Sequence, residues 1–403
     1  MHVNQPEETE TGDILNDALF RRNKEVEELY NLTIEYGKGD GNTLQSSVLA
    51  DEDYYDMCIA TIAGTGLSVP SNSGLLMDLC TIDELSLDKP WWSQLMYDSL
   101  SIGGKLYYTS GDISPAMYCA PGCYYANKPL LADHKIECED IYASVHDGSW
   151  TIDKMISLTK DMDRDLNNDG VMSEADDYFG QLNEVGTLST AVHLVGAGVK
   201  TSEIDKDGKL VLNFNNEYTI SVIEKLQKIL TNFTPKDIHT AFMNDRIVFL
   251  KHYVSSAYTR YRDMKSDFLI LPMPKYDEKQ ESYYSLVNTW CTSFVGVPKT
   301  ADAEKIGFIM EALAYKSYVD IRPQVYDVAF KAKGARNEED ASMLDIIFDT
   351  LYLDFNSFLD FGGAMTALNN ALFNEKGLAS EYASIESAAT AEIEKFTNTW
   401  MGN

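Results

Sequence analysis

Basic residues are scarce in this sequence. Its 403 residues include 33 Lys and Arg against 63 Asp and Glu, which gives a formal net charge of −30. A surface of that sign repels phosphate backbones and anionic lipid headgroups, so the composition argues against a nucleic-acid-binding protein. Neutral solutes, cationic partners and divalent metal ions remain compatible with it.

Long hydrophobic runs are also absent. No stretch approaches the roughly 18 apolar residues that a membrane-spanning helix needs, so the sequence predicts no such helix. The start, Met1 to Pro6, has neither a basic segment nor an apolar run and does not resemble a signal peptide. The sequence therefore fits either a cytosolic protein or an exported one whose leader is not included in it.

Cysteine is too sparse for a disulfide framework, with 6 in 403 residues. Cys119 and Cys123 are spaced C-x3-C, which is neither a redox C-x2-C nor half of a recognisable zinc site. Free thiols are the simplest interpretation. A local disulfide among Cys119, Cys123 and Cys138 is the alternative.

Local catalytic signatures are missing as well. The sequence contains no G-x-S-x-G, no H-E-x-x-H and no P-loop, and its 6 His are scattered. This argues modestly against an enzyme. With 63 acidic residues, however, a pair of catalytic carboxylates remains open, which leaves a glycosidase as an alternative.

Core-forming residues are plentiful. Hydrophobic types make up 44% of the sequence and aromatic types 11%, which excludes global disorder. A chain of 403 residues exceeds one ordinary core, so we expect two domains or one large two-lobed body.

The first sixty residues have an α/β pattern. Apolar residues recur at helical spacing across Asp13–Asn31, with Asp13 as a plausible cap. A strand at Leu32–Glu35, a helix near Thr43–Ala50 and a strand at Tyr54–Ala60 would follow. Strand, helix and strand in this order predict a parallel sheet. Because such a sheet usually begins with a strand, we expect the first strand to be missing from this sequence.

The loop after the second strand is a candidate ligand contact. Thr61–Leu67 follows the carboxyl end of a predicted parallel strand, where open α/β sheets bind ligands. Gly64 and Gly66 would allow the backbone to approach a ligand closely. The loop is not a G-x-G-x-x-G, so it does not predict a dinucleotide site.

Two further polar and aromatic segments are notable. Trp91 and Trp92 are adjacent, and two adjacent tryptophans cannot both face one core, so at least one would cover a crevice. A structural aromatic lid is favoured over a ligand platform. Asp112 lies in a small, polar stretch that has the character of a crossover between lobes.

The sharpest motif is Asp165–Asp176, which fits the twelve-residue calcium loop. It has oxygen-bearing side chains at positions 1, 3, 5, 9 and 12, glycine at position 6 and a backbone ligand expected at position 7. The predicted ligands of a structural Ca²⁺ ion are Asp165, Asn167, Asp169, Val171, Ser173 and Asp176. Since no second loop follows, the motif favours a structural role over a switch. A metal-free turn is the alternative.

Several segments resemble one protein family. Phe268–Asp277 resembles a strand and turn of the family 1 extracellular solute-binding proteins of ABC transporters. Ser293–Thr300, with the helix that follows to Tyr318, is similar to that family's return strand and long helix. Lys89–Trp92 and Tyr125–Leu131 also match, and the order of these segments holds along nearly the whole chain. The nearest resemblance is to carbohydrate receptors of anaerobic Gram-positive bacteria.

The resemblance implies a two-lobed α/β fold of the periplasmic-binding-protein type II, with a helical C-terminal region. Each lobe would be a mostly parallel sheet flanked by helices. Lobe one would comprise residues 1–113 and 264–299, and lobe two residues 114–263 and 300–403. The lobes would close on a ligand by a hinge motion. The family also implies a monomeric lipoprotein on the extracellular face of the membrane that works with ABC permease subunits.

A sugar presents CH faces that stack on aromatic rings and hydroxyl groups that need polar partners. The segments that the resemblance directs toward the cleft supply both kinds of side chain. The predicted ligand-binding residues are Gly64, Thr65, Asp112, Tyr258, Tyr261, Arg262 and Trp290. A core position for Trp290 and an ion pair with Asp263 for Arg262 are the alternatives.

Three functional hypotheses follow. The first is an extracellular receptor that captures a small neutral solute, in particular an oligosaccharide, and delivers it to an ABC permease. The second is a secreted carbohydrate-active enzyme that a calcium loop stabilises. The third is a calcium-dependent surface module that binds a protein partner. The resemblance favours the first, and with it a protein that is not an enzyme.

Overall fold

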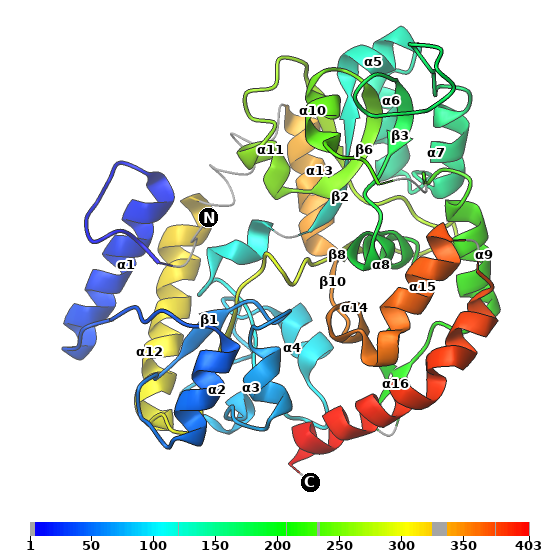
Figure 1. The fold of residues 1–403 in the computed structure, drawn as a ribbon. Coiled ribbons are helices and arrows are strands. Elements are labelled where there is room, and N and C mark those ends of the chain that lie inside the picture. The colour runs from blue at the N-terminus through cyan, green and yellow to red at the C-terminus, as the bar shows by residue number, and fades with distance from the viewer. Residues whose placement is uncertain are drawn as a thin grey trace.

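The structure is a computed structural model of the chain, and it describes residues 5–119, 121–206, 208–231, 234–324, 337–374 and 376–402. The chain folds into two lobes, with the C-terminal helix running along one side of both (Figure 1). We call the lobe around the β1–β9 pair lobe one and the lobe around the four-stranded sheet lobe two.

Lobe one is built around a core that includes Leu67, Trp92 and Phe294. Short helices and a two-stranded antiparallel sheet, β1–β9, surround this core. Its elements are α2 (Gly41–Leu49), β1 (Cys58–Ala60), α3 (Ser68–Asn72), the 3-10 helix η1 (Leu79–Thr81), α4 (Gln94–Leu100), β9 (Phe294–Gly296) and α12 (Ala303–Lys316).

Lobe two contains a fully buried sheet with the strand order β3-β6-β2-β7. The sheet strands are β2 (Gly122–Asn127), β3 (Phe179–Leu182), β6 (Ile247–Tyr253) and β7 (Phe268–Leu271). The helices of this lobe up to residue 259 are α5 (Lys128–Asp133), α6 (Cys138–His146), α7 (Ile152–Thr159), α8 (Thr187–Gly196), α9 (Glu217–Leu226), α10 (Ile238–Met243) and α11 (Ser255–Thr259).

The remaining elements lie beside or between the lobes. The paired strands are β4 (Ser202–Ile204) with β5 (Leu210–Leu212), and β8 (Ser285–Leu286) with β10 (Leu351–Tyr352). The remaining helices are α1 (Ile14–Tyr30), η2 (Pro115–Cys119), the π-helical turn η3 (Ser317–Ile321), α13 (Glu338–Asp349), α14 (Asn356–Leu359), η5 (Phe361–Gly363), α15 (Ala364–Phe373) and α16 (Leu378–Met401).

Local sequence explains where several helices begin. Asp13 caps α1 by accepting the backbone N–H groups of Leu15 and Asn16, as predicted. Asp40 and Thr43 form a reciprocal capping box at the start of α2. These side chains satisfy N–H groups that have no partner within the helix, which fixes the first turn.

The predicted βαβ unit is wrong in its first strand. Residues 32–40 form neither helix nor strand. The backbone N–H of Ile34 donates to the Glu27 carboxylate of α1 at 2.9 Å, so this segment bonds to a helix side chain instead of a sheet. Strand β1 is also shorter than predicted, and it pairs antiparallel with β9 rather than parallel with a neighbour.

The two-lobed α/β fold class is confirmed, but the sheets are mixed instead of mostly parallel. In lobe two, β3 and β6 are parallel, whereas β2 runs antiparallel to both β6 and β7. The reason is the position of β2. It enters the lobe directly from lobe one and lies between two strands that run back toward lobe one.

The structure divides the chain differently from the predicted boundaries of 1–113 with 264–299 and 114–263 with 300–403. Strand β7 was assigned to lobe one, but it pairs with β2 and therefore belongs to lobe two. Helix α12 was assigned to lobe two, but its apolar face is buried in the core of lobe one. Helix α16 contacts both cores, through Leu378 in lobe two and Phe396 in lobe one.

Free thiols account for the cysteines whose side chains are described. Cys58, Cys80, Cys123, Cys138 and Cys291 are unpaired, so the structure contains no Cys123–Cys138 disulfide. The side chain of Cys119 lies outside the described part of the chain. Among the described helices, none combines the length and the apolar character needed to cross a membrane.

Candidate functional site

One end of the sheet in each lobe lies beside the segments in which the chain passes between the lobes. We call residues 112–119 and 121 the first crossover and residues 287–293 the second crossover. Pro121 pairs with Val287 in an isolated antiparallel bridge, and Ser110 donates a 2.8 Å hydrogen bond to the carbonyl of Ser293. Because strands from both lobes end beside these segments, loop residues of both lobes meet there.

On the lobe-one side, Gly64 and Trp290 lie against each other. A Cβ atom built on Gly64 would come within 2.9 Å of Cζ3 of the Trp290 indole, and Gly64 has φ +63°. Both the contact and the backbone conformation require glycine at this position. Trp290 is 60% exposed, so the predicted core position is excluded for it. Thr65 is exposed beside Gly64 in the same loop.

The backbone around Trp290 is fixed by a short turn. The Asn288 side chain, which is buried, accepts the backbone N–H of Trp290 at 2.9 Å. The carbonyl of Asn288 accepts the N–H groups of Cys291 and Thr292. An exposed indole is thus presented on an ordered turn of the second crossover, which is how a preorganised aromatic contact is built.

On the lobe-two side, a charged cluster lies at the ends of β3 and β6. The Lys251 ammonium is completely buried and lies 3.3 Å from the carboxylate of Glu184, whose side chain is 41% exposed. Glu184 follows the end of β3, and Lys251 is close to the end of β6, which is parallel to β3. Burial lowers the pKa of Lys251, and the neighbouring carboxylate of Glu184 raises it in part.

Sequence analysis missed this cluster. A single Glu and a single Lys, 67 positions apart, have no local signature. Only the parallel pairing of β3 with β6 brings them together. The available signal was that Glu184 comes shortly after one buried strand and Lys251 lies near the end of another, where α/β sheets collect functional side chains.

The two sides are neighbours in space. Tyr253, the last residue of β6, is buried and pairs with Gly122, which directly follows Pro121, and Pro121 bridges to Val287 of the second crossover. Trp290 belongs to the same crossover. An exposed indole of one lobe and a partly exposed carboxylate of the other therefore lie near the same boundary between the lobes.

Ser256, His252 and Glu184 lie in the order of a catalytic triad. Ser256 Oγ is 2.6 Å from His252 Nδ1, and His252 Nε2 is 3.8 Å from Glu184. Ser256, however, is only 1% exposed. Burial, together with the Lys251 charge, lowers the pKa of His252 to about 2. A buried hydroxyl beside an imidazole that cannot accept a proton near neutral pH is a poor nucleophile.

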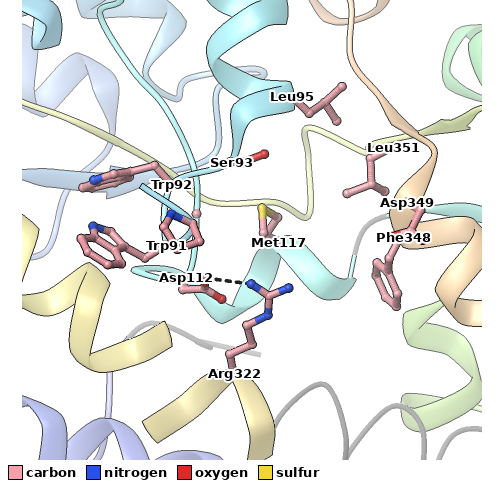
Figure 2. A pocket seen from close by; sticks show the side chains of 12 residues that line it. Trp91, Trp92, Ser93, Leu95, Asp112, Met117, Arg322, Phe348, Asp349 and Leu351 are labelled. Carbon is pink, nitrogen blue, oxygen red and sulfur yellow. Dashed lines mark ion pairs between the residues drawn. The ribbon is translucent and has the colours of Figure 1, made fainter. Parts of the chain in front are cut away.

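Asp112 lies apart from Trp290, in a cavity of about 260 Å³ shown in Figure 2. It is almost fully buried, and its carboxylate lies 3.6 Å from the guanidinium of Arg322. The cavity extends to Ser93 and Leu95 of lobe one and to Leu351 after α13. Neither Gly64 nor Trp290 lines this cavity, whereas Trp92 and Gly111, which form an isolated bridge, both do.

The adjacent tryptophans are explained by one carboxylate. The indole N–H groups of Trp91 and Trp92 donate to the two oxygens of Glu311 in α12, each at 2.9 Å. Trp92 is buried and Trp91 is half-buried over Tyr315. The favoured prediction of a structural aromatic lid agrees with this arrangement.

Of the remaining predicted ligand residues, Tyr261 does not join the site. Tyr261 is completely buried in lobe two, where its ring packs against Tyr125 and its hydroxyl lies 2.7 Å from His239. It was predicted because the resemblance directs its segment toward the cleft, but its side chain belongs to the core. Arg262 is exposed, and the side chain of Tyr258 lies outside the described part of the chain.

The predicted calcium loop forms a closed turn. The Asp165 carboxylate accepts the backbone N–H groups of Asn168 and Gly170, and Asp169 accepts those of Val171 and the side chain of Asn167. Gly170 has φ +80°, as the sharp turn at position 6 requires. No group of three or more His, Cys, Asp and Glu side chains is arranged to hold a metal within the described ranges.

No protein-family model matches the sequence, and no curated protein matches it by sequence. Solved structures match it over almost its full length. An ABC substrate-binding protein from Listeria monocytogenes, in complex with cycloalternan, aligns with a TM-score of 0.56 and 15% identity over 96% of each chain. A cyclo/maltodextrin-binding protein complexed with maltotetraose aligns with a TM-score of 0.62 and 13% identity, over 93% of this chain and 92% of the other.

A third match is UgpB from Mycobacterium tuberculosis in complex with glycerophosphocholine, with a TM-score of 0.57 and 12% identity over 94% of this chain and 95% of the other. The chain has the fold of ABC-transporter substrate-binding proteins. The predicted resemblance is therefore confirmed at the level of the fold. In this substrate-binding-protein fold, the Trp290 turn and the Glu184–Lys251 pair lie at the boundary of the two lobes.

The buried histidines predict a loss of stability on acidification. His252 is neutral in the folded chain, with a pKa of about 2 against about 6.5 when unfolded. The folded state is therefore favoured above about pH 6.5, and this stability is lost as the pH falls toward 2. Between pH 7 and pH 5 we expect His252 to contribute a loss of about 2 kcal/mol in the free energy of unfolding.

Urea denaturation at the two pH values measures this contribution. H252Q should lose about 2 kcal/mol less than the wild type between pH 7 and pH 5. His193, whose pKa burial lowers to about 3, is the matched site, and H193Q should show a similar gain. Equal losses in the wild type and in H252Q would contradict a buried neutral His252.

Proposed function

We propose that this protein is an extracellular solute-binding receptor that captures a small neutral solute, specifically an oligosaccharide, between its lobes and delivers it to an ABC permease. The proposal rests on an exposed indole in the second crossover and on a charged pair near the strand ends of lobe two, both close to the boundary between the lobes. Trp290 belongs to the second crossover, and Glu184 and Lys251 to the sheet of lobe two.

This combination suits a carbohydrate. The exposed face of Trp290 offers an apolar surface for the CH face of a sugar ring. The carboxylate of Glu184 can accept hydrogen bonds from hydroxyl groups, and its 3.3 Å contact with the buried Lys251 orients it. Such charge-assisted hydrogen bonds give direction and selectivity to an otherwise apolar contact.

Neighbouring structures support the ligand class. The matched protein from Listeria monocytogenes is in complex with cycloalternan, and the cyclo/maltodextrin-binding protein is complexed with maltotetraose. We extend this ligand class to the present chain because its fold aligns with both over more than nine-tenths of their lengths. The assignment as a receptor and not an enzyme has the same support, since the aligned proteins are binding proteins.

Cellular location and partners belong to the same proposal. A receptor of this fold would act as a monomer on the extracellular face of the cytoplasmic membrane, where a lipid anchor outside the described residues would hold it. Its hinge would close around the solute, and the closed form would dock on permease subunits. The surface charge of −30 favours neutral cargo over anionic cargo.

Calorimetric titration with maltotetraose and with a cyclic glucan tests the binding function. We expect one class of glucan to bind, and W290A to weaken its affinity by at least about tenfold because the stacking surface is lost. E184Q should weaken it as well, since the charged acceptor becomes neutral. Mass spectrometry of the glucan after incubation should find no product.

Tyr54 provides the matched control, because it is 69% exposed and lies in a surface loop of lobe one. Y54A should bind the glucan as the wild type does. An affinity that stays within twofold in both W290A and E184Q would contradict the proposed site. Turnover of the glucan would contradict the receptor function.

The calcium loop is proposed as a structural Ca²⁺ site. Asp165, Asn167, Asp169 and Ser173 supply side-chain oxygens, and the carbonyl of Val171 and the carboxylate of Asp176 would complete the set. The fit is supported by the turn itself, in which Asn167 and Asp169 already face each other at 3.0 Å. A hard cation prefers such an all-oxygen set.

Thermal unfolding with calcium and with a chelator tests the metal site. At a free calcium concentration about 100 times Kd, binding to the folded state alone adds about 2.7 kcal/mol, so the midpoint should rise by several degrees. D169A should abolish this shift. D205A is the control, because Asp205 forms a similar turn by accepting the N–H of Lys209 without the loop motif. A calcium shift that persists in D169A would refute the site.

A further inference from the structure

Helix α12 and its π-helical turn connect the cores of the two lobes. The apolar face of α12, including Met310 and Leu313, is buried in lobe one. Ile321, at the end of the π-helical turn, is buried in a different cluster that includes Leu344 and Ile347 of α13 in lobe two. A helix with each end buried in a different lobe must bend or slide when the lobes rotate.

The π-helical turn lies between these two anchored ends. It spans Ser317–Ile321 and directly continues α12, with neither proline nor glycine in it to cause the change. A π-turn inside a helix has a wider hydrogen-bond pattern than the α-helix and is a frequent mark of functional positions. We therefore expect the helix to bend at this turn.

Arg22 of α1 holds this turn in place. Its guanidinium Nη1 donates to the Ser317 side chain at 2.9 Å and to the carbonyl of Ile113 at 3.2 Å. Its Nε and Nη2 donate to the Asn23 side chain. One side chain thus joins α1, the first crossover and the π-helical turn. Helix α1 lies beside α12 along this edge of the molecule (Figure 1).

The Arg22 guanidinium is buried, with 3% of the residue exposed, and the oxygens to which it donates are neutral. Burial lowers the pKa of Arg22. A cation held inside a protein by neutral acceptors costs free energy that a methionine of similar length would not. The arginine instead fixes the relative positions of several elements, because its planar guanidinium donates hydrogen bonds to all of them.

A second link joins the same two segments. Asp112 is next to Ile113 in the first crossover, and Arg322 directly follows the π-helical turn. Their side chains form the 3.6 Å ion pair that Figure 2 shows, at the wall of the cavity described above for Asp112. The first crossover and the π-helical turn are therefore tied on two sides, beside a space into which neighbouring side chains can move.

We propose that this group is the pivot of the lobe motion. Arg22 holds the π-helical turn against the first crossover through its hydrogen bonds. When the lobes rotate, α12 bends at Ser317–Ile321, and the first crossover rotates about its contact with Arg22. The Arg22 hydrogen bonds restrict the ligand-free protein to a narrow range of lobe orientations. A receptor that is already ordered loses less conformational entropy when it closes on a ligand, so removal of these hydrogen bonds weakens binding.

R22M tests the pivot, because it retains the length of the side chain and removes its hydrogen bonds. Arg21 is the matched control, since it is adjacent, its side chain is 57% exposed, and it pairs only at the surface with Glu10. Hydrogen exchange should become about tenfold faster in Ser317–Ile321 in R22M and stay unchanged in R21M. Small-angle X-ray scattering of ligand-free R22M should give a larger radius of gyration than R21M gives.

S317A is the milder variant, because it removes one acceptor and leaves the guanidinium in place; it should accelerate exchange of the same amides, to a smaller extent. The affinity experiment rests on the proposed function, and R22M should bind the glucan about fivefold more weakly than R21M. The pivot would be overturned if, in both R22M and S317A, the exchange rate in Ser317–Ile321 and the radius of gyration equalled those of R21M, whether or not glucan binds. Absence of glucan binding in all variants, with faster exchange in R22M, would leave the pivot intact and refute the proposed function.

Discussion

Two chain crossings that are hydrogen bonded to each other determine the rest of this structure. The first crossover and the second crossover are joined by the Pro121–Val287 bridge, and Ser110, just before the first crossover, donates a hydrogen bond to Ser293 of the second. Because β2 enters lobe two from the first crossover and β9 enters lobe one from the second, one end of each sheet lies beside the crossovers. Loops that follow the opposite strand ends are then forced to face each other across the boundary of the lobes.

The polar interior follows from this geometry. Charged residues on helices as well as near the ends of buried strands lie where water is limited, and each such residue needs a partner. Lys251 has Glu184, Glu311 binds both indoles of the Trp91–Trp92 pair, and Arg22 bonds to three neutral oxygens. The directional bonds of these groups fix the orientation of the elements that carry them, which apolar packing alone does not.

The sequence predicted features that depend on local order. The cap of α1 at Asp13 and the turn at Gly170 follow from residues that are near each other in the chain. Gly64 and Trp290 were both predicted as candidates, although nothing in the sequence indicated that they touch. The two-lobed fold was recognised from the order of segments and not from any single motif.

What the sequence could not predict depends on pairing across long distances. Glu184 and Lys251 meet only because β3 and β6 are parallel neighbours, and β7 belongs to lobe two because it pairs with β2. Tyr261 was predicted at the site because the resemblance directs its segment toward the cleft, but burial among aromatic rings places it in the core. A period-two pattern gives the face of a segment and does not show which lobe covers that face.

The most direct test of this account is a crystal structure of the protein with a bound glucan such as maltotetraose. The account predicts a sugar ring stacked on the Trp290 indole, with a hydroxyl group donating to Glu184 from the other lobe. It also predicts that the Arg22 contacts to Ile113 and Ser317 are retained. A sugar bound elsewhere, away from both Trp290 and Glu184, would contradict the central claim that the ligand joins the two lobes at the crossovers.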